Sequence, residues 1–249
     1  MGDFRLQISD FRLDFKFHVA SLWRPINNIM AHSPIENDVL IIGAGGHGAV
    51  VLDVLRAQGL YRPVGFIDAE PSLTGKVIED VSVLGPLNLL PRLRGKVGKA
   101  IIAIGDNRIR WSYAKKLAND GFELVNAIHP SAVISQTATL GKNIVVCAGA
   151  IVSTSARIAD SVLINTGALI DHECVIGEAV HLGPACKLAG RVEVERGAFV
   201  GIGACVIQCL KIGSHAVVGA GAVVISDVAE SDTVVGVPAK SLKLRRAVA

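Results

Sequence analysis

The sequence predicts two folded parts in series, an α/β domain followed by a parallel β-helix. Between residues 37 and 127, apolar strand-like runs alternate with helical segments, which indicates βαβ units on a parallel sheet. From residue 128 to residue 229, an aliphatic residue recurs at every sixth position, a period that fits neither a helix nor an ordinary strand. A six-residue period is typical of a parallel β-helix, in which each unit forms one side of a coil.

The first 36 residues stand apart from both parts. The tetrapeptide DFRL occurs twice, at Asp3 and Asp10, and apolar residues alternate with polar ones as they do in a strand. Met30 stands just before the first recognisable domain. We expect residues 1–36 to be an appendage, disordered or artefactual, and assign it no function.

Residues 37–127 are predicted to form a small Rossmann-like domain. The strand DVLII runs into the turn GAGGHG, and the helical segment AVVLDVLRAQ then ends before Gly59. Further strands are expected in VGFIDAE, KAIIAIGDN and FELVNAI, with a helix over RIRWSYAKKLAND that ends before Gly121. Within that helix, Arg110 is expected to be a solvated side chain.

The glycine-rich turn places Gly43, Gly45 and Gly48 in GxGxxG register after an apolar strand. Backbone amides and a helix N-terminus at such a turn suit a phosphate or pyrophosphate. Asp68 ends the next strand, where a ribose hydroxyl would be bound. Alone, the pattern supports an NAD(P)-linked oxidoreductase. However, the domain is short and no hydride-transfer site is evident, and the pyrophosphate of a nucleotide sugar would satisfy the same amides.

Residues 128–229 divide into seventeen hexads without an insertion. The first position of every hexad is Ile, Leu or Val, and the fifth is always Ala, Val, Ile, Leu or Cys. We therefore expect the first position to point into the coil and the fifth to lie near a corner. Three sides make a coil of about eighteen residues, and successive coils stack at the parallel-strand spacing of ~4.8 Å. Residues 230–249 are expected to be a C-terminal tail with a solvated basic end.

Composition excludes several classes of protein. The formal net charge is +3 and charges of both signs are interspersed, which argues against a nucleic-acid-binding surface. No apolar run reaches the ~18 residues that a membrane span needs. We interpret the cysteines as small buried apolar residues of a cytoplasmic protein, without disulfides or a zinc site. They are Cys147, Cys174, Cys186, Cys205 and Cys209.

The hexads, together with the closing GVPAK (Gly236 to Lys240), resemble those of the left-handed β-helix acyltransferases of the hexapeptide-repeat superfamily. The ordered set GAGGHG, AIGDNRIR, IHPSAVIS and ALIDHECVIGEAVH is similar to that of bacterial sugar acetyltransferases, from Asp38 to about Leu242. These include enzymes that N-acetylate nucleotide-linked amino sugars and the sialic-acid O-acetyltransferases. The resemblance implies an acetyl-CoA-dependent acetyltransferase of surface-glycan biosynthesis, assembled as a homotrimer and without a metal.

Acetyl transfer needs a base for the proton of the nucleophile and a donor for the developing oxyanion. His172 occupies an outward-facing third position of its hexad, and the imidazole of a histidine titrates near ~6.5, close to working pH. The resemblance also makes this histidine the general base, with Glu173 orienting it. Eighteen residues beyond His172 is Gly190, which should lie directly above it and offer its N–H to an oxyanion.

His181 lies one and a half hexads from His172, so the two should project from different sides of the coil. They could meet only between neighbouring β-helices, which predicts active sites at subunit interfaces. The resemblance implies that His181 contacts acetyl-CoA near the thioester and that Asn165 lies near the amine of the acceptor. It also assigns the glycine-rich loop and the GDN segment to the nucleotide. The implied residues are Gly43, Gly45, Gly46, His47, Gly48, Asp68, Asp106, Asn107 and Arg108.

Two alternatives stay open at this point. The same histidine could serve O-acetylation of a sialic-acid-like sugar, because the sequence does not distinguish a nitrogen nucleophile from an oxygen nucleophile. An NAD(P)-linked oxidoreductase could instead use the β-helix only for trimerisation.

Overall fold

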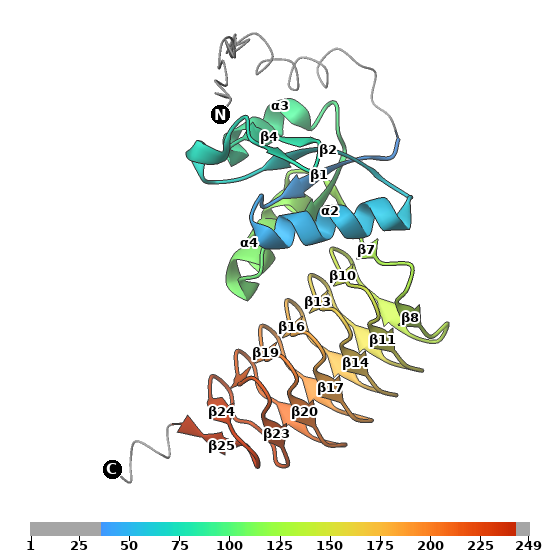
Figure 1. Cartoon of the computed structure of the whole chain (residues 1–249), viewed down its shortest axis with the longest axis vertical. Coiled ribbons are helices and arrows are strands. Elements are labelled where there is room, and N and C mark those ends of the chain that lie inside the picture. Colours follow the sequence, from blue (N-terminus) through green and yellow to red (C-terminus); the bar gives the residue numbers. More distant parts are fainter. Residues whose placement is uncertain (1–35, 243–249) are drawn as a thin grey trace, which may run out of the picture.

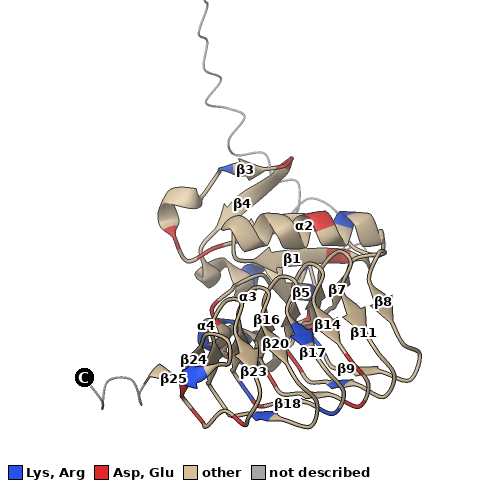
Figure 2. Cartoon of the chain, turned by 60° about the horizontal axis from the view of Figure 1, so that its bottom comes forward, with Lys and Arg blue, Asp and Glu red and all other residues tan. Residues whose placement is uncertain are grey.

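The computed structural model describes residues 36–242 and shows the two predicted parts in the predicted order. An α/β domain sits across the first coils of a left-handed parallel β-helix, and the coils then run on to the C-terminal end (Figure 1). Acidic and basic positions are scattered over both parts (Figure 2). Among residues 36–242, no helix is long and apolar enough to cross a bilayer.

The α/β domain is built on one sheet of order β3-β4-β2-β1-β5-β6. Strand β1 lies at its centre and pairs in parallel with β2 and β5. The elements are β1 (Asp38–Ile42), α2 (Gly46–Gln58), β2 (Arg62–Ile67), η2 (Pro71–Leu73), β3 (Val77–Ile78), β4 (Val81–Gly85), η3 (Leu87–Leu89), α3 (Leu90–Leu93), β5 (Lys99–Ile102), α4 (Asn107–Asn119) and β6 (Glu123–Leu124).

The sheet is covered on both faces, which explains why β1 is a continuous apolar run. Val39 and Ile41 pack in one cluster with α2, whereas Leu40 and Ile42 pack in another with α3 and α4. The α2 cluster also contains Val145 and Leu163 of the β-helix, so the two parts share a core. As expected, α2 ends at Gly59, which is left-handed with φ 70°.

The β-helix has three faces, and up to the last coil each strand pairs in parallel with the strand eighteen residues further along, as in Val145 with Leu163. Face 1 consists of β7 (Ala127–Ile128), β10 (Val145–Val146), β13 (Leu163–Ile164), β16 (His181–Leu182), β19 (Phe199–Val200), β22 (Val217–Val218), β24 (Thr233–Val235) and the antiparallel β25 (Lys240–Ser241). Face 2 consists of β8 (Val133–Ile134), β11 (Ile151–Val152), β14 (Leu169–Ile170), β17 (Lys187–Leu188), β20 (Cys205–Val206) and β23 (Val223–Val224). Face 3 consists of β9 (Thr139–Leu140), β12 (Arg157–Ile158), β15 (Val175–Ile176), β18 (Glu193–Val194) and β21 (Lys211–Ile212).

The core of the β-helix follows the hexads. First positions such as Ile170, Ile176 and Leu182 are at most 1% exposed, and fifth positions such as Cys174 and Val180 are fully buried. These residues form one aliphatic cluster along the whole axis. The prediction that the first position points inward is therefore confirmed.

Three sequence expectations need correction. The predicted strand FELVNAI is two strands, because β6 pairs with β5 of the α/β domain whereas β7 pairs with β10 of the β-helix. The hairpin of β3 and β4 was not predicted, although VSV alternates as a strand does. The β-helix continues beyond residue 229, because β24 pairs with β22 in face 1. The expectations for residues 1–35 lie outside the described residues.

The prediction that Arg110 is a solvated side chain is wrong. It is 1% exposed, and its guanidinium lies between α4 and the coils of the β-helix. The next residue, Trp111, also contacts the β-helix, because its Nε1 donates to Glu178 Oε2 at 3.1 Å. The amphipathic pattern of α4 does not reveal that its polar side docks on a second domain.

Candidate active site

His172 lies in the turn that leads from face 2 to face 3, between β14 and β15. Its Nδ1 is 3.0 Å from Glu173 Oε2, and Glu173 reaches this position from a left-handed backbone with φ 59°. A carboxylate at Nδ1 favours the tautomer that carries its proton there, which leaves Nε2 as a proton acceptor. The predicted pairing of Glu173 with His172 is present in the structure.

Gly190 lies one coil further along, against the ring of His172. A Cβ atom added to Gly190 would overlap His172 Nε2, so any other residue at this position would push the imidazole out of its place. The His172 carbonyl accepts from Arg191 N at 2.9 Å, which ties the two turns together. Within residues 36–242, the Gly190 N–H has no hydrogen-bond partner. The predicted stacking of Gly190 on His172 is confirmed.

His181 begins β16 and projects from face 1, a different face from that of His172. Its ring meets Phe199 edge-on, with centroids 4.9 Å apart. The Nε2 atom is buried without a hydrogen-bond partner in the described part of the chain. Burial, and then the charge of Arg110, lower the pKa of His181 to about 4, so this imidazole is neutral at physiological pH.

His47 stands in the first turn of α2, on the side of the α/β domain that faces His181. Its Nε2 is also buried, and it too has no partner among the described residues. Burial and the charge of Arg110 lower the pKa of His47 to about 4. The structure thus brings together two neutral imidazoles, one from each domain, each with an unused ring nitrogen.

The glycine-rich loop opens on a cavity of about 410 Å³ that Gly43, Gly45, Gly46, His47 and Asp68 all line. Gly43 has φ 112°, and a Cβ atom there would collide with the Ala103 carbonyl. Asp68 accepts from Ala44 N at 2.7 Å and so fixes the loop. Gly48 does not line the cavity; a Cβ atom on it would overlap the Gly43 carbonyl, so this glycine allows α2 to pack closely on the loop.

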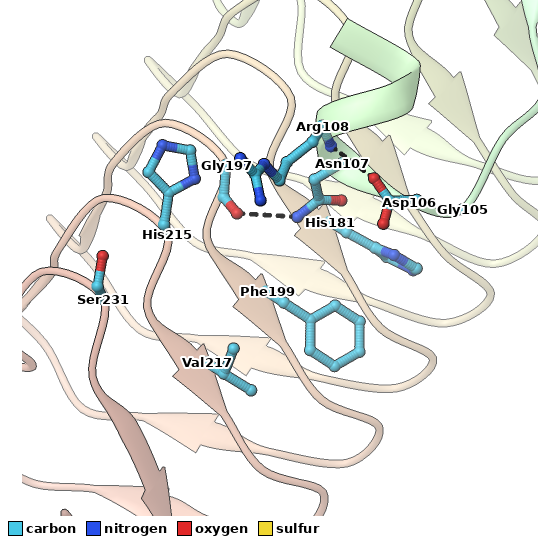
Figure 3. A pocket seen from close by; sticks show the side chains of 10 residues that line it. All are labelled: Gly105, Asp106, Asn107, Arg108, His181, Gly197, Phe199, His215, Val217 and Ser231. Carbon is cyan, nitrogen blue, oxygen red and sulfur yellow. Dashed lines mark hydrogen bonds between the residues drawn. The ribbon is translucent and has the colours of Figure 1, made fainter. Parts of the chain in front are cut away.

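A second cavity of about 710 Å³ runs along face 1 from His181 toward the C-terminal coils (Figure 3). Gly105 lines both cavities, which makes it the point where they adjoin. The predicted Asp106, Asn107 and Arg108 line this second cavity and not the one at the glycine-rich loop. Its other lining residues are Gly197, Phe199, His215, Val217 and Ser231.

Like Asp68, the predicted nucleotide-binding residues Asp106 and Asn107 have structural partners. Asp106 caps α4 by accepting from Arg108 N and Ile109 N, both at 2.9 Å. Asn107 Nδ2 donates to the carbonyls of Gly197 and Ala198 across the domain junction. Arg108 is exposed at the rim of the second cavity.

Asn165 follows β13, next to the strand of His181 on face 1, since Leu163 pairs with His181. Its Oδ1 accepts from Thr166 N at 2.8 Å. It lines neither of the two cavities. Phe199 and Val217, which sequence reasoning missed, could have been found by counting eighteen and thirty-six residues from His181, because face 1 stacks them in line.

Known proteins share this arrangement. The model of the PglD N-terminal domain matches residues 38–117. The crystal structure of PerB from Caulobacter crescentus, in complex with CoA and GDP-perosamine, superimposes with a TM-score of 0.80 at 44% identity, covering 84% of this chain and 99% of that one. The chain belongs to the PglD and PerB family of sugar N-acetyltransferases.

Two further members of the family agree. The acetyltransferase domain of PglB from Neisseria gonorrhoeae, in complex with acetyl coenzyme A, has a TM-score of 0.78 at 36% identity and covers 83% of this chain and 99% of that one. The UDP-N-acetylbacillosamine N-acetyltransferase of Bacillus subtilis is 36% identical over 115 residues, or 45% of this chain. That match spans about half the length of the Bacillus enzyme, 51%. Members of this N-acetyltransferase family thus bind CoA and nucleotide-linked sugars.

Proposed function

We propose that the protein transfers the acetyl group of acetyl-CoA to the amine of a nucleotide-linked amino sugar, in bacterial surface-glycan biosynthesis in the cytoplasm. The observation that carries the proposal is the pairing of His172 Nε2 with Gly190, a base beside a backbone N–H that has no partner within residues 36–242. Acyl transfer to an amine needs this combination of a proton acceptor and an oxyanion donor. Family membership supports the donor and the class of acceptor.

The proposed reaction is direct attack within a ternary complex. The amine nitrogen forms a bond to the thioester carbonyl carbon while His172 Nε2 takes the amine proton. The Gly190 N–H holds the carbonyl oxygen as it becomes negative. When the carbon–sulfur bond breaks, the electron pair leaves on sulfur and the proton held by His172 passes to it. The contact with Glu173 stabilises the imidazolium that forms in between.

The two catalytic halves would come from different subunits. His172 and His181 project from different faces of one β-helix, so they cannot face each other within a chain. In a homotrimer of β-helices packed side by side, the turn that carries His172 would meet face 1 of a neighbour. Acetyl-CoA would lie between them, held by His181 on one side and by Gly190 on the other.

The acceptor would bind from the α/β domain. The cavity at the glycine-rich loop suits the nucleotide, whose phosphates would approach the loop amides and the start of α2. The sugar would then extend past His47 and Gly105 toward His181, because the two cavities adjoin there. Asn165 and Arg108 remain proposed contacts of the acceptor.

The decisive experiment is a screen of GDP-, UDP- and dTDP-linked amino sugars with acetyl-CoA, following release of the free thiol. We expect turnover that requires both the nucleotide and the free amine. The matched hydroxy sugar nucleotides serve as the control, and turnover with these alone would replace the proposal with O-acetylation. Binding of NADH without binding of CoA would contradict it.

A further inference from the structure

Arg110 is a buried cation without a carboxylate partner. Its guanidinium is 1% exposed, and it forms no ion pair within residues 36–242. All five of its N–H groups are instead satisfied by neutral oxygens. The acceptors, at 2.8 to 3.3 Å, are the carbonyls of Ile104, Gly105, Ser161, Ala179 and Val180 and the Oδ1 atom of Asn107.

These acceptors belong to two domains. Ile104, Gly105 and Asn107 precede or begin α4 in the α/β domain, and the remaining carbonyls lie on two turns of the β-helix. A buried charge without hydrogen-bond partners is costly. This dehydrated guanidinium is therefore stable in its position only while all of its carbonyl acceptors stay in place. The side chain therefore fixes the backbone of one domain against the backbone of the other.

Two of the acceptors flank the imidazole of His181. Val180 is the residue before it, and Gly105 lines the same cavity as His181. The Nε2 atom of the same ring has no hydrogen-bond partner in the described part of the chain.

We propose that Arg110 is a positioning residue for acetyl transfer, which holds the Gly105 carbonyl and the chain entering His181 in one fixed relation. In that relation, His47 lines the cavity at the glycine-rich loop, His181 lines the cavity along face 1, and Gly105 lines both. The reaction that Arg110 serves rests on the proposed function, whereas its effect on the ring of His181 does not. Lysine cannot replace it fully, because an ammonium has three N–H donors where the planar guanidinium has five.

The first test compares kcat and KM for Arg110→Lys, Arg110→Met and two controls. Trp111→Phe removes a different hydrogen bond across the same junction, and Arg92→Met makes the same substitution at an exposed residue. We expect Arg110→Met to lose about 100-fold in kcat, as a displacement near 1 Å can cause, with both KM values within about three-fold of wild type. Arg110→Lys should lose about ten-fold, and the controls should keep the wild-type kcat.

The second test follows the ring of His181 by nitrogen-15 NMR in the full chain without substrate. Wild type should show a neutral ring with one dominant tautomer, and Arg110→Lys should show a mixture of the two tautomers. The NMR measurement detects the effect of Arg110 on the His181 ring even if no substrate is acetylated. A failed substrate screen can therefore be distinguished from a failed role for Arg110. If Arg110→Met does not fold, Arg110→Lys carries both tests.

Two outcomes would overturn the proposal. One is an Arg110→Lys protein with unchanged kcat and an unchanged His181 tautomer. The other is a Trp111→Phe protein that loses as much kcat as the Arg110 variants, since the junction as a whole would then be responsible.

Discussion

His172 and Gly190 are stacked one coil apart, with the imidazole lying on the glycine where a side chain would otherwise be. The eighteen-residue repeat places every residue above its counterpart in the previous coil, so an outward side chain meets the residue above it. At most positions a Cβ atom would fill that space. Here its absence lets the ring occupy that space and brings Nε2 close to the free N–H of Gly190.

Gly190→Ala should reduce activity while leaving the fold intact. The added methyl would displace only the end of the His172 side chain, and the backbone of Gly190 has no left-handed φ that alanine would strain. We expect kcat to fall about 100-fold, the scale of displacing a catalytic group by about 1 Å, with little change in the melting temperature. Gly95→Ala is the control, because a Cβ atom there meets nothing within 4 Å. Full activity in Gly190→Ala would contradict the stacked site.

His172→Asn should abolish most turnover without preventing ligand binding. Loss of a general base typically costs about 10² to 10⁴ in kcat. His172 is 43% exposed, so its removal should not unfold the protein. His129→Asn, at a half-buried histidine whose ring contacts Ser131, is the matched control. Steady-state rates at saturating acetyl-CoA and acceptor decide the matter; a variant that retains most of its turnover would exclude His172 as the base.

Mixing two inactive variants should restore activity if each site uses two subunits. His172→Ala lacks the base and His181→Ala lacks the residue on the neighbouring face, so neither homotrimer is complete. Random co-assembly of equal amounts should recover about one quarter of the wild-type sites. The rate after co-refolding, compared with that of the separately refolded variants, measures this. No recovery from demonstrably mixed trimers would place both histidines in one chain's site.

The protein should lose stability in mild acid because of His47 and His181. Both pKa values are lowered by burial and the charge of Arg110 to about 4 in the folded chain, from 6.5 in the unfolded chain. Below pH 6.5 the unfolded chain therefore binds protons that the folded chain cannot. The free energy of unfolding should be highest above this value and fall toward pH 4.

Urea unfolding at about pH 7.5 and about pH 5 measures that loss. The variant with both His47→Asn and His181→Asn should lose less than wild type between the two conditions, since neither amide titrates. His129→Asn should behave as wild type. Equal losses in all three proteins would show that other groups cause the acid sensitivity.

The β-helix could be predicted almost residue by residue, because its period is local and repeats without interruption. Counting eighteen residues from His172 found Gly190, a contact between residues distant in sequence. The last coil was missed because the period fails there: Val217 pairs with Thr233, only sixteen residues on.

The junction between the domains could not be predicted. No spacing rule relates α4 to the turn at Ala179, so Arg110 could not be distinguished from an arginine on a solvated helix. For the same reason, the contacts of Asp106 and Asn107 could not be predicted from spacing. The family resemblance implied nucleotide binding for both, and the structure adds that Asp106 caps α4 and that Asn107 joins it to the β-helix. The glycine-rich loop was predicted better, because a strand, a turn and a helix start define its geometry locally.

Because its coils repeat every eighteen residues, the β-helix can change length only by whole coils if its side chains are to stay on the same faces. Inserting or deleting eighteen residues beyond Gly190 would lengthen or shorten the groove along face 1 by about one strand spacing, ~4.8 Å, and leave the catalytic turns untouched. A change of six residues would instead turn every later side chain onto the next face. The length available to a bound coenzyme therefore changes only by whole coils. It depends on the number of residues in the β-helix and not on the side chains that carry out the chemistry.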